Sequence, residues 1–246
     1  MTEHKNLPRK IAAQDVVVST AQRGSLVARG LLAVQNNKQL ALTDNNGALS
    51  AEEQYSLGRM YFEGKSFPQD YEDAMKCFRL AAEQGHAYAQ AQLGVMYVDG
   101  VGVPQDYEKA VKWFQLAADQ GDADFQYTLG VMYVDGAGVP QDYKVAEKWY
   151  RLAADQGHVS AQYDLGMMYF TGEGVAQDFQ EAKKWFRNAA DQGDADGQHN
   201  LGAMYDNGIG VPQNDGEAVN WYRLAANQGN VKAQEALRKL GIAWKK

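Results

Sequence analysis

The side chains in this sequence that could act in catalysis or hold a metal are few and form no recognised pattern. The single cysteine, Cys77, excludes a disulfide framework and a zinc site made of several thiolates, and we expect it to be a buried, unreactive thiol. The chain has no nucleophile elbow and no His-Glu-x-x-His pair among its four histidines, which are His4, His86, His158 and His199. These residues therefore predict neither a metal centre nor a nucleophilic catalyst.

Two glycine patterns resemble parts of nucleotide-binding loops. The Gly-Lys-Ser string at 64–66 ends like a phosphate-binding loop, but the leading glycine of that motif would fall at position 59, which is Arg59. The pair Gly100 and Gly102 lacks the third glycine and the preceding strand of a dinucleotide site. We interpret both patterns as loop glycines and expect no cofactor.

Carboxylates are plentiful, but several of them recur at one fixed interval. Catalytic acids and bases are expected to be singular, whereas an aspartate that recurs just before helical segments is typical of an N-cap. We therefore predict caps at Asp70, Asp106, Asp142 and Asp178. On this basis the protein is predicted not to be an enzyme.

The charge of the chain is unevenly distributed. Its 24 basic and 31 acidic residues give a net charge of −7, which argues against a general nucleic-acid binder. Residues 51–230 hold 27 acidic and 13 basic residues, whereas the segments before and after are mildly basic. An acidic body favours a partner with a basic segment.

No apolar run approaches the roughly 18–20 residues needed to cross a bilayer, so no membrane insertion is expected. The uncharged stretch from Val16 to Ala21 is shorter than the apolar region of a signal peptide. If Met1 is the native start, the sequence predicts a cytoplasmic protein, with secretion by a route independent of a signal peptide left open.

The chain contains 25 glycines, and their regular spacing indicates the repeated elements that position its polar side chains. Leu-Gly pairs begin at positions 57, 93, 129, 165 and 201, each 36 residues after the last. A period between 20 and 50 residues is the signature of a solenoid. The chain is therefore predicted to be a repeat protein.

Each unit has the pattern of two helices. In the second unit one arc of the first helix carries Gln90, Leu93, Gly94, Met96 and Tyr97. A glycine-containing loop follows, and Asp106 then begins a second helix whose outer arc is charged, as expected of a solvent-facing surface. Gly121 is placed to close that helix, and Gly94, inside the first helix, predicts a close approach of its partner helix.

The recurring string A-x-x-x-L-G-x-M-Y-x-x-G-x-G-V-P-Q-D, followed by A-x-x-W-[FY]-x-x-A-A-x-Q-G, resembles the Sel1-like repeat family, a relative of the tetratricopeptide repeat. The resemblance covers five units in residues 51–230. It departs at the first loop, which loses a glycine, and at Ala176, where the other units have proline. It implies an all-α, right-handed α/α solenoid of five 36-residue helix-turn-helix repeats and roles in assembling complexes, in signalling or in host interaction by bacteria.

The ends of the chain do not follow the repeat. Residues 231–246 supply only a first helix, with Arg238 in the glycine position, and are predicted to form a C-terminal capping helix. Residues 1–50 are interpreted as a partly disordered N-terminal extension or cap, in which Ser25 to Gln35 is a candidate helix packed on the first repeat.

The arc of the first helices opposite the repeated leucine is the candidate partner-binding surface, because its residues vary between units. If first helices line the concave side, as they do in tetratricopeptide-type solenoids, this groove would present apolar and aromatic side chains edged by aspartates. Some of these side chains could instead pack between neighbouring repeats. The predicted groove residues are Tyr55, Arg59, Phe62, Tyr88, Val95, Val98, Tyr127, Val131, Val134, Tyr163, Met167, Phe170 and His199.

The sequence thus favours a non-catalytic scaffold or adaptor that binds a peptide or helix of a partner through a basic or apolar segment. Three alternatives stay open: a bacterial effector or immunity-type inhibitor, a homo-oligomer, and an enzyme, such as a hydrolase, with an unrecognised site. Cysteine-rich members of the family have been linked to β-lactam binding or hydrolysis, but they have a disulfide in each repeat and this chain has a single cysteine.

Overall fold

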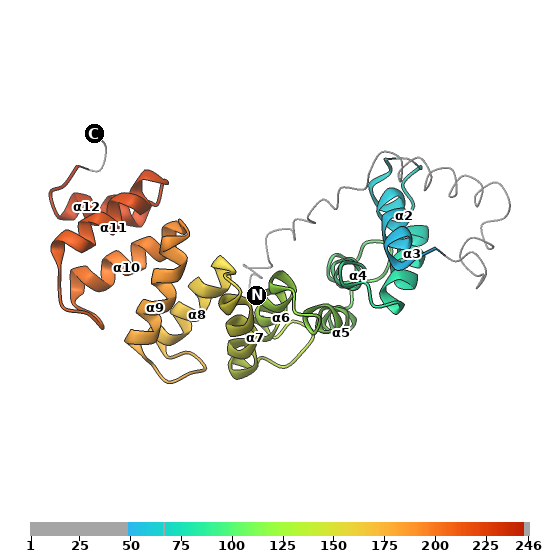
Figure 1. The fold of residues 1–246 in the computed structure, drawn as a ribbon, viewed down its shortest axis with the longest axis horizontal. Coiled ribbons are helices and arrows are strands. Elements are labelled where there is room, and N and C mark those ends of the chain that lie inside the picture. Colours follow the sequence, from blue (N-terminus) through green and yellow to red (C-terminus); the bar gives the residue numbers. More distant parts are fainter. Residues whose placement is uncertain (1–48, 66, 244–246) are drawn as a thin grey trace. The chain divides into compact units, whose positions relative to one another are not determined.

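The computed structural model describes residues 49–65 and 67–243, and within them every regular element is an α-helix. Each repeat consists of a first helix and a second helix, and the two kinds alternate along the chain (Figure 1). The first helices are α2 (Ala51–Glu63), α4 (Ala87–Asp99), α6 (Ala123–Asp135), α8 (Val159–Thr171) and α10 (Ala195–Asn207). The second helices are α3 (Tyr71–Glu83), α5 (Tyr107–Ala118), α7 (Tyr143–Asp155), α9 (Phe179–Asp191) and α11 (Asp215–Asn227), and α12 (Val231–Lys239) follows them. The predicted all-α solenoid of helix pairs is confirmed.

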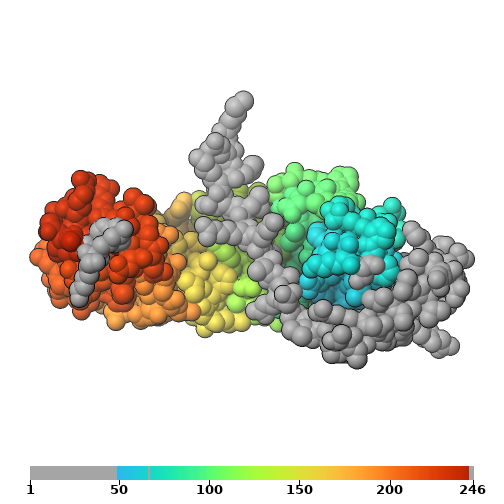
Figure 2. All heavy atoms as spheres, turned by 90° about the horizontal axis from the view of Figure 1, so that it is seen from above, coloured from blue at the N-terminus to red at the C-terminus, as the bar shows by residue number. Residues whose placement is uncertain are grey.

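The described residues fall into two compact units. The first holds α2 to α5 and α6 up to Met132, together with residues 136–140. The second holds Tyr133–Asp135 and everything from residue 141, that is α7 to α12. Figure 2 shows α9 to α12, in orange and red, as closely packed atoms. The candidate helix at Ser25 to Gln35 lies outside the described residues.

Each helix begins at a residue whose side chain accepts a hydrogen bond from the first turn. The predicted caps Asp70, Asp106, Asp142 and Asp178 all do so, which confirms their structural role. His86 does the same with a ring nitrogen, because its Nδ1 lies 3.1 Å from the backbone N–H of Ala89 that donates to it. His158 caps α8 in the same way.

In four repeats the glycine inside the first helix, at Gly58, Gly94, Gly166 and Gly202, lets the second helix of the same repeat approach closely. A Cβ atom at Gly94 would lie 2.8 Å from the Phe114 ring, and one at Gly166 would lie 2.7 Å from the Phe186 ring. Real Cβ atoms are essentially never found that close to another heavy atom, so a larger residue at either position would force the ring aside. The close approach predicted from Gly94 is confirmed.

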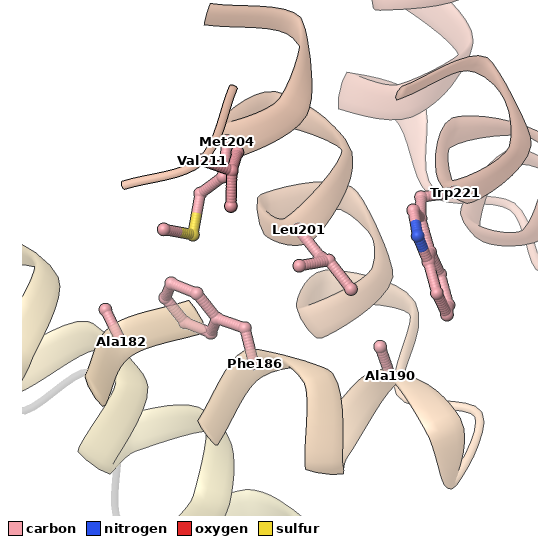
Figure 3. Packing of buried hydrophobic residues seen from close by; sticks show 7 residues of the cluster. All are labelled: Ala182, Phe186, Ala190, Leu201, Met204, Val211 and Trp221. Atoms are coloured by element: carbon pink, nitrogen blue, oxygen red, sulfur yellow. The ribbon is translucent and has the colours of Figure 1, made fainter. Parts of the chain in front are cut away.

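The core of each repeat forms around that aromatic ring. In the second unit Phe186 is fully buried, and Leu201 and Met204 of the next first helix pack in the same cluster (Figure 3). Trp221 lies beside Leu201 and Ala190 in the same view, so it joins one repeat to the next. This tryptophan position therefore packs between helices.

Hydrogen bonds made by glutamine side-chain amides connect successive repeats. Buried Gln198 of α10 donates through Nε2 to the carbonyl of Ala190 at 3.1 Å, and its Oε1 accepts from Gln228 Nε2 at 2.9 Å. Gln90 makes the same two contacts in the first unit, with Ala82 and Gln120. Each buried amide thus has a partner for its nitrogen and for its oxygen, as a buried polar group requires.

Candidate functional site

The predicted groove residues lie on the first helices, and none of them is fully solvent-exposed. Two are buried: Tyr55 is 4% exposed and Val131 is 7% exposed. The other eleven are partly buried, and they are Arg59, Phe62, Tyr88, Val95, Val98, Tyr127, Val134, Tyr163, Met167, Phe170 and His199. The packing between neighbouring repeats that the sequence left open therefore takes up part of this surface.

In the first unit the aromatic members of this set contact one another and the ring of their own repeat. Tyr55 stacks on His86 with ring centroids 4.5 Å apart and is tilted against Phe78 at 5.8 Å. Tyr88 meets Phe125 of the next first helix edge to face at 5.4 Å. These contacts hold Tyr55 and Tyr88 in place, with Tyr55 buried and Tyr88 partly exposed.

The second unit repeats this arrangement around Phe186. Tyr163 lies 5.9 Å from that ring and Phe170 lies 6.1 Å from it, both tilted. Met167 packs against the same cluster, and its sulfur accepts a hydrogen bond from Asn200 at 3.4 Å. The structure thus brings Tyr163, Met167 and Phe170 together on one helix, α8.

Burial sets the protonation of the polar members. It raises the pKa of Tyr88 and of Tyr163, with Asp122 and Asp196 acting in the same direction, so both hydroxyls stay protonated. Burial also lowers the pKa of His199, and the Lys232 charge adds to that effect. This surface therefore offers neutral hydroxyl and imidazole groups beside its carboxylates.

The charges of the first and second helices differ sharply. The second helices hold acidic and basic residues in near balance, ten against eleven. The five first helices hold Arg59 as their one basic residue against nine acidic residues: Glu52, Glu53, Glu63, Asp99, Asp124, Asp135, Asp164, Asp196 and Asp206. The acidic character of residues 51–230 is therefore concentrated on the first helices.

The second helices carry exposed leucines that the sequence reading missed. Leu116 is 47% exposed, and Leu152 and Leu224 are each 48% exposed. These positions are 36 residues apart or a multiple of that, and Leu80 occupies the same place in the first repeat. The signal was present in the recurring Leu-Ala-Ala string, but we read the outer arc of these helices as uniformly solvated.

One polar cluster in the second unit recurs only in part, since its contact between an arginine and a tryptophan is found again one repeat later, between Arg187 and Trp221. Arg151 of α7 donates to Glu147 at 2.7 Å and to the hydroxyl of Tyr169, and its guanidinium lies 5.9 Å from the centre of the Trp185 ring. The Trp185 indole N–H donates to Glu181 at 3.1 Å. The cluster ties three consecutive helices together, and each of its charges has a partner, which is the chemistry of a structural contact rather than of catalysis.

The lone thiol is placed where it cannot react. Cys77 is 2% exposed and packs with Leu57 and Phe67. Burial raises its pKa to about 12, with Asp73 adding to the effect. Among the described residues no three His, Cys, Asp or Glu side chains gather closely enough to hold a metal ion.

None of the helices in the described part of the chain has the length and apolar character needed to span a membrane.

The repeats match a known family model. The model for the Sel1 repeat matches residues 54–86, 87–122, 123–158, 159–194 and 195–230. These ranges reproduce the five-unit periodicity, each taking one first helix and one second helix. Sel1 repeats mediate protein–protein interactions.

Solved structures share the fold over most of the chain. A protective antigen of uropathogenic Escherichia coli with an SLR fold is 38% identical over 89% of this chain, with a TM-score of 0.76, and this chain spans 45% of its length. A Sel1 repeat protein from Oxalobacter formigenes is 31% identical, with 89% of this chain and 92% of that chain covered and a TM-score of 0.70. An immunity protein from Pseudomonas aeruginosa is 24% identical over 74% of this chain and 67% of its own, with a TM-score of 0.42, a likeness limited to the helical fold.

Proposed function

Because the chain belongs to the Sel1 repeat family, we propose that it is a non-catalytic scaffold that binds a basic segment of another protein along its first helices. The observation that supports this most is the division of charge, with nine acidic residues and one basic residue on the first helices and near balance on the second helices. Packing alone does not require this division, because both kinds of helix bury apolar faces.

The acidic side chains lie beside rings that are already held in place. Tyr163 and Phe170 are fixed by contacts with Phe186, so a partner that packs on them restricts little further side-chain motion. Aromatic anchors of this kind carry a large share of the energy in protein interfaces. The partner segment is therefore expected to place one or two apolar side chains among basic residues.

Some carboxylates stand where helix stability would favour the opposite charge. Asp99 and Asp135 are exposed at the C-terminal ends of α4 and α6, and neither helix has a basic residue in its last turn. A negative charge at a helix C-terminus opposes the helix dipole, at a cost of roughly 0.3–1 kcal/mol. Binding of a basic partner supplies a physical reason for keeping them.

The test compares capture of partners by matched variants. Tyr127→Ala with Tyr163→Ala removes two predicted anchors, and capture from native cells followed by mass spectrometry identifies what is lost. We expect partners to be lost from this variant while it keeps the helical circular dichroism of the native protein. Unchanged capture by the folded double variant would move the site away from the first helices.

The alternatives give different outcomes in the same experiment. A secreted effector would capture host proteins, whereas an immunity-type inhibitor would capture one toxin. An enzyme would instead turn over a small molecule and would lose that activity on substitution of acid–base residues that do not repeat.

A further inference from the structure

The first helix of the first repeat, α2, has one face without a helix partner among the described residues. In later repeats α4, α8 and α10 pack against the second helix of the repeat before, which is α3, α7 and α9 respectively. Figure 3 shows such packing in the second unit, where Met204 of α10 lies beside Ala182 and Phe186 of α9. The described residues before α2 hold no second helix, so the corresponding face of α2 lacks this contact.

A methionine on this face is less well covered than its counterparts. The methionine that recurs in first helices is at most 6% exposed in the four later repeats, at Met96, Met132, Met168 and Met204. Met60, its counterpart in α2, is only partly buried although it packs against a cluster of buried residues. The later methionines therefore have a cover that Met60 has only in part.

A buried amide on α2 indicates the chemistry of the missing contact. Gln54 is 6% exposed, and its Oε1 accepts a hydrogen bond from Gln84 Nε2 at 2.7 Å. The matching glutamines of α4, α8 and α10 make the same contact and also donate through Nε2 to a carbonyl of the second helix before them, as Gln90 does to Ala82 at 3.1 Å. The Nε2 of Gln54 has no hydrogen-bond partner among the described residues. The group that fits this amide is a backbone carbonyl near the end of a second helix.

The sequence before α2 contains a segment with the pattern of a second-helix end. Four of the five second helices end in Leu-Ala-Ala-x-Gln-Gly, and residues 31–36 read Leu-Leu-Ala-Val-Gln-Asn. Leucine, alanine and glutamine stand at the same places, and asparagine, here Asn36, is a residue that also occurs in place of the glycine after a helix. The match is confined to this end, because Ala28 and Arg29 stand where four repeats have a tryptophan followed by phenylalanine or tyrosine.

We propose that the segment from Ser25 to Gln35 docks on the open face of α2 as the second helix that precedes the first repeat. In this arrangement the carbonyl of Ala33 accepts from Gln54 Nε2, because Ala33 stands two residues before its glutamine as Ala82 does. The thirteen residues from 37 to 49 can extend about 40 Å, which is enough for the chain to return to the start of α2. The docking needs no other protein, so it stands apart from the partner binding proposed above.

A designed disulfide tests where the segment lies. In the second unit a Cβ atom at Gly197 of α10 would lie 3.2 Å from the Cβ of Ala189 in α9, which is within reach of a disulfide. The matching positions are Glu53 in α2 and Leu32 in the segment. Leu32→Cys with Glu53→Cys in the full chain should therefore form a disulfide within one chain when treated with oxidised glutathione, as measured by mass spectrometry. The native Cys77 is buried and does not compete.

The control moves one cysteine by a single residue along α2. Leu32→Cys with Glu52→Cys turns the thiol to another side of the helix and should give at least about tenfold less of the disulfide. Equal yields from the two variants, or no disulfide in the Glu53 variant, would overturn the proposal. A disulfide between two chains would do the same, because it would place a second copy on this face.

Hydrogen exchange gives a second readout without added cysteines. Leu31→Asp with Leu32→Asp should release the segment and speed exchange of the α2 amides by about tenfold, while exchange in α10 stays unchanged. Val16→Asp with Val17→Asp is the control, because it places the same charges outside the second-helix pattern and should leave α2 as in the native chain. Native exchange of α2 in the leucine variant, or equal acceleration in both variants, would contradict the docking whatever the first helices bind.

Discussion

The first and second helices of each repeat have similar lengths but are built for different surroundings. In α4 buried positions run almost around the helix, including Gln90, Leu93 and Gly94, whereas in α5 they follow one stripe that contains Phe114. First helix α4 packs against the second helix of its own repeat, α5, and of the repeat before, α3, and α10 does the same with α11 and α9. Second helices keep an outer face that carries mixed charge and, in three repeats, an exposed leucine.

The difference shows which residues the fold needs and which it leaves free. The first helices need a glycine and an amide because a ring and a carbonyl approach them from two sides. Their remaining exposed positions are almost all acidic or neutral, while the second helices leave lysines and aspartates in balance. The partner binding that we propose concerns the first helices, and each prediction below sets one kind of helix against the other.

The largest effect is expected from filling the glycine of a first helix. Gly166→Val would drive side-chain atoms into the Phe186 ring, which a Cβ alone would already approach to 2.7 Å. We expect a loss of at least about 3 kcal/mol in the free energy of unfolding, measured by urea denaturation. Gly216→Val in a second helix is the control, because Gly216 is exposed, and it should change the free energy by less than about 1 kcal/mol. Equal losses of unfolding free energy for Gly166→Val and Gly216→Val would contradict this difference between first and second helices.

A smaller loss should follow removal of a glutamine amide. Gln198→Ala removes two hydrogen bonds, one to the Ala190 carbonyl and one from the Gln228 amide, and should cost about 2 kcal/mol by urea denaturation. Gln228→Ala on the second-helix side removes an exposed amide, so water can replace it and the cost should be well under half as large. A larger loss of stability from Gln228→Ala than from Gln198→Ala would show that the second-helix amide, not the first-helix amide, contributes more.

The histidine cap of α4 should act as a hydrogen-bond acceptor for the first turn of the helix. Both His86→Asn and His86→Ala lose the ring stacked on Tyr55, but asparagine keeps an acceptor for the N–H of Ala89. The asparagine variant should therefore be more stable than the alanine variant by about 1 kcal/mol in thermal or urea unfolding. Asn214→Ala at the start of second helix α11 should cost a similar amount. Identical stabilities for the two His86 variants would rule out capping.

The smallest effect expected is a pH dependence confined to the fifth first helix. Burial lowers the pKa of His199 in the folded chain, so below about pH 6.5 the unfolded chain binds a proton more readily. Stability contributed by the neutral ring is present above that pH and is lost as the pH falls through the lowered pKa. His199→Asn should reduce the difference in urea midpoint between pH 7.5 and about pH 5.5. An unchanged difference would show that His199 titrates alike in both states.

The helix pairs, caps and glycine contacts could be predicted from the sequence because they solve one packing problem five times. Asp106 and Gly94 recur at the same spacing in other repeats, and such repetition marks a structural requirement without any relative for comparison. The cap at His86 is harder to predict than the aspartate caps. At His86 a ring nitrogen accepts the hydrogen bond that a carboxylate accepts at the aspartate caps. A histidine in the sequence does not by itself predict this role.

The candidate surface was harder to predict because periodicity does not say what the neighbouring repeat covers. Tyr55 and Val131 lie on the arc that should have been open, yet His86 of the next repeat stacks on Tyr55 and both side chains are buried. The contact between Gln198 and Gln228 also escaped notice, since identical residues in every repeat give no sign of which pairs meet. The exposed leucines were missed because the outer arc of the second helices was interpreted as charged throughout.

The most direct test of the division between helices neutralises equal charge on each kind of helix. Asp99→Asn with Asp135→Asn removes two exposed carboxylates from first helices, and Glu83→Gln with Glu108→Gln removes two from second helices. Quantitative capture of partners by the two variants should show roughly fivefold weaker binding for the first-helix variant, from about 0.5 kcal/mol for each lost exposed ion pair. The second-helix variant should bind like the native chain. Equal loss in both, or loss only in the second-helix variant, would contradict the assignment of partner binding to the first helices.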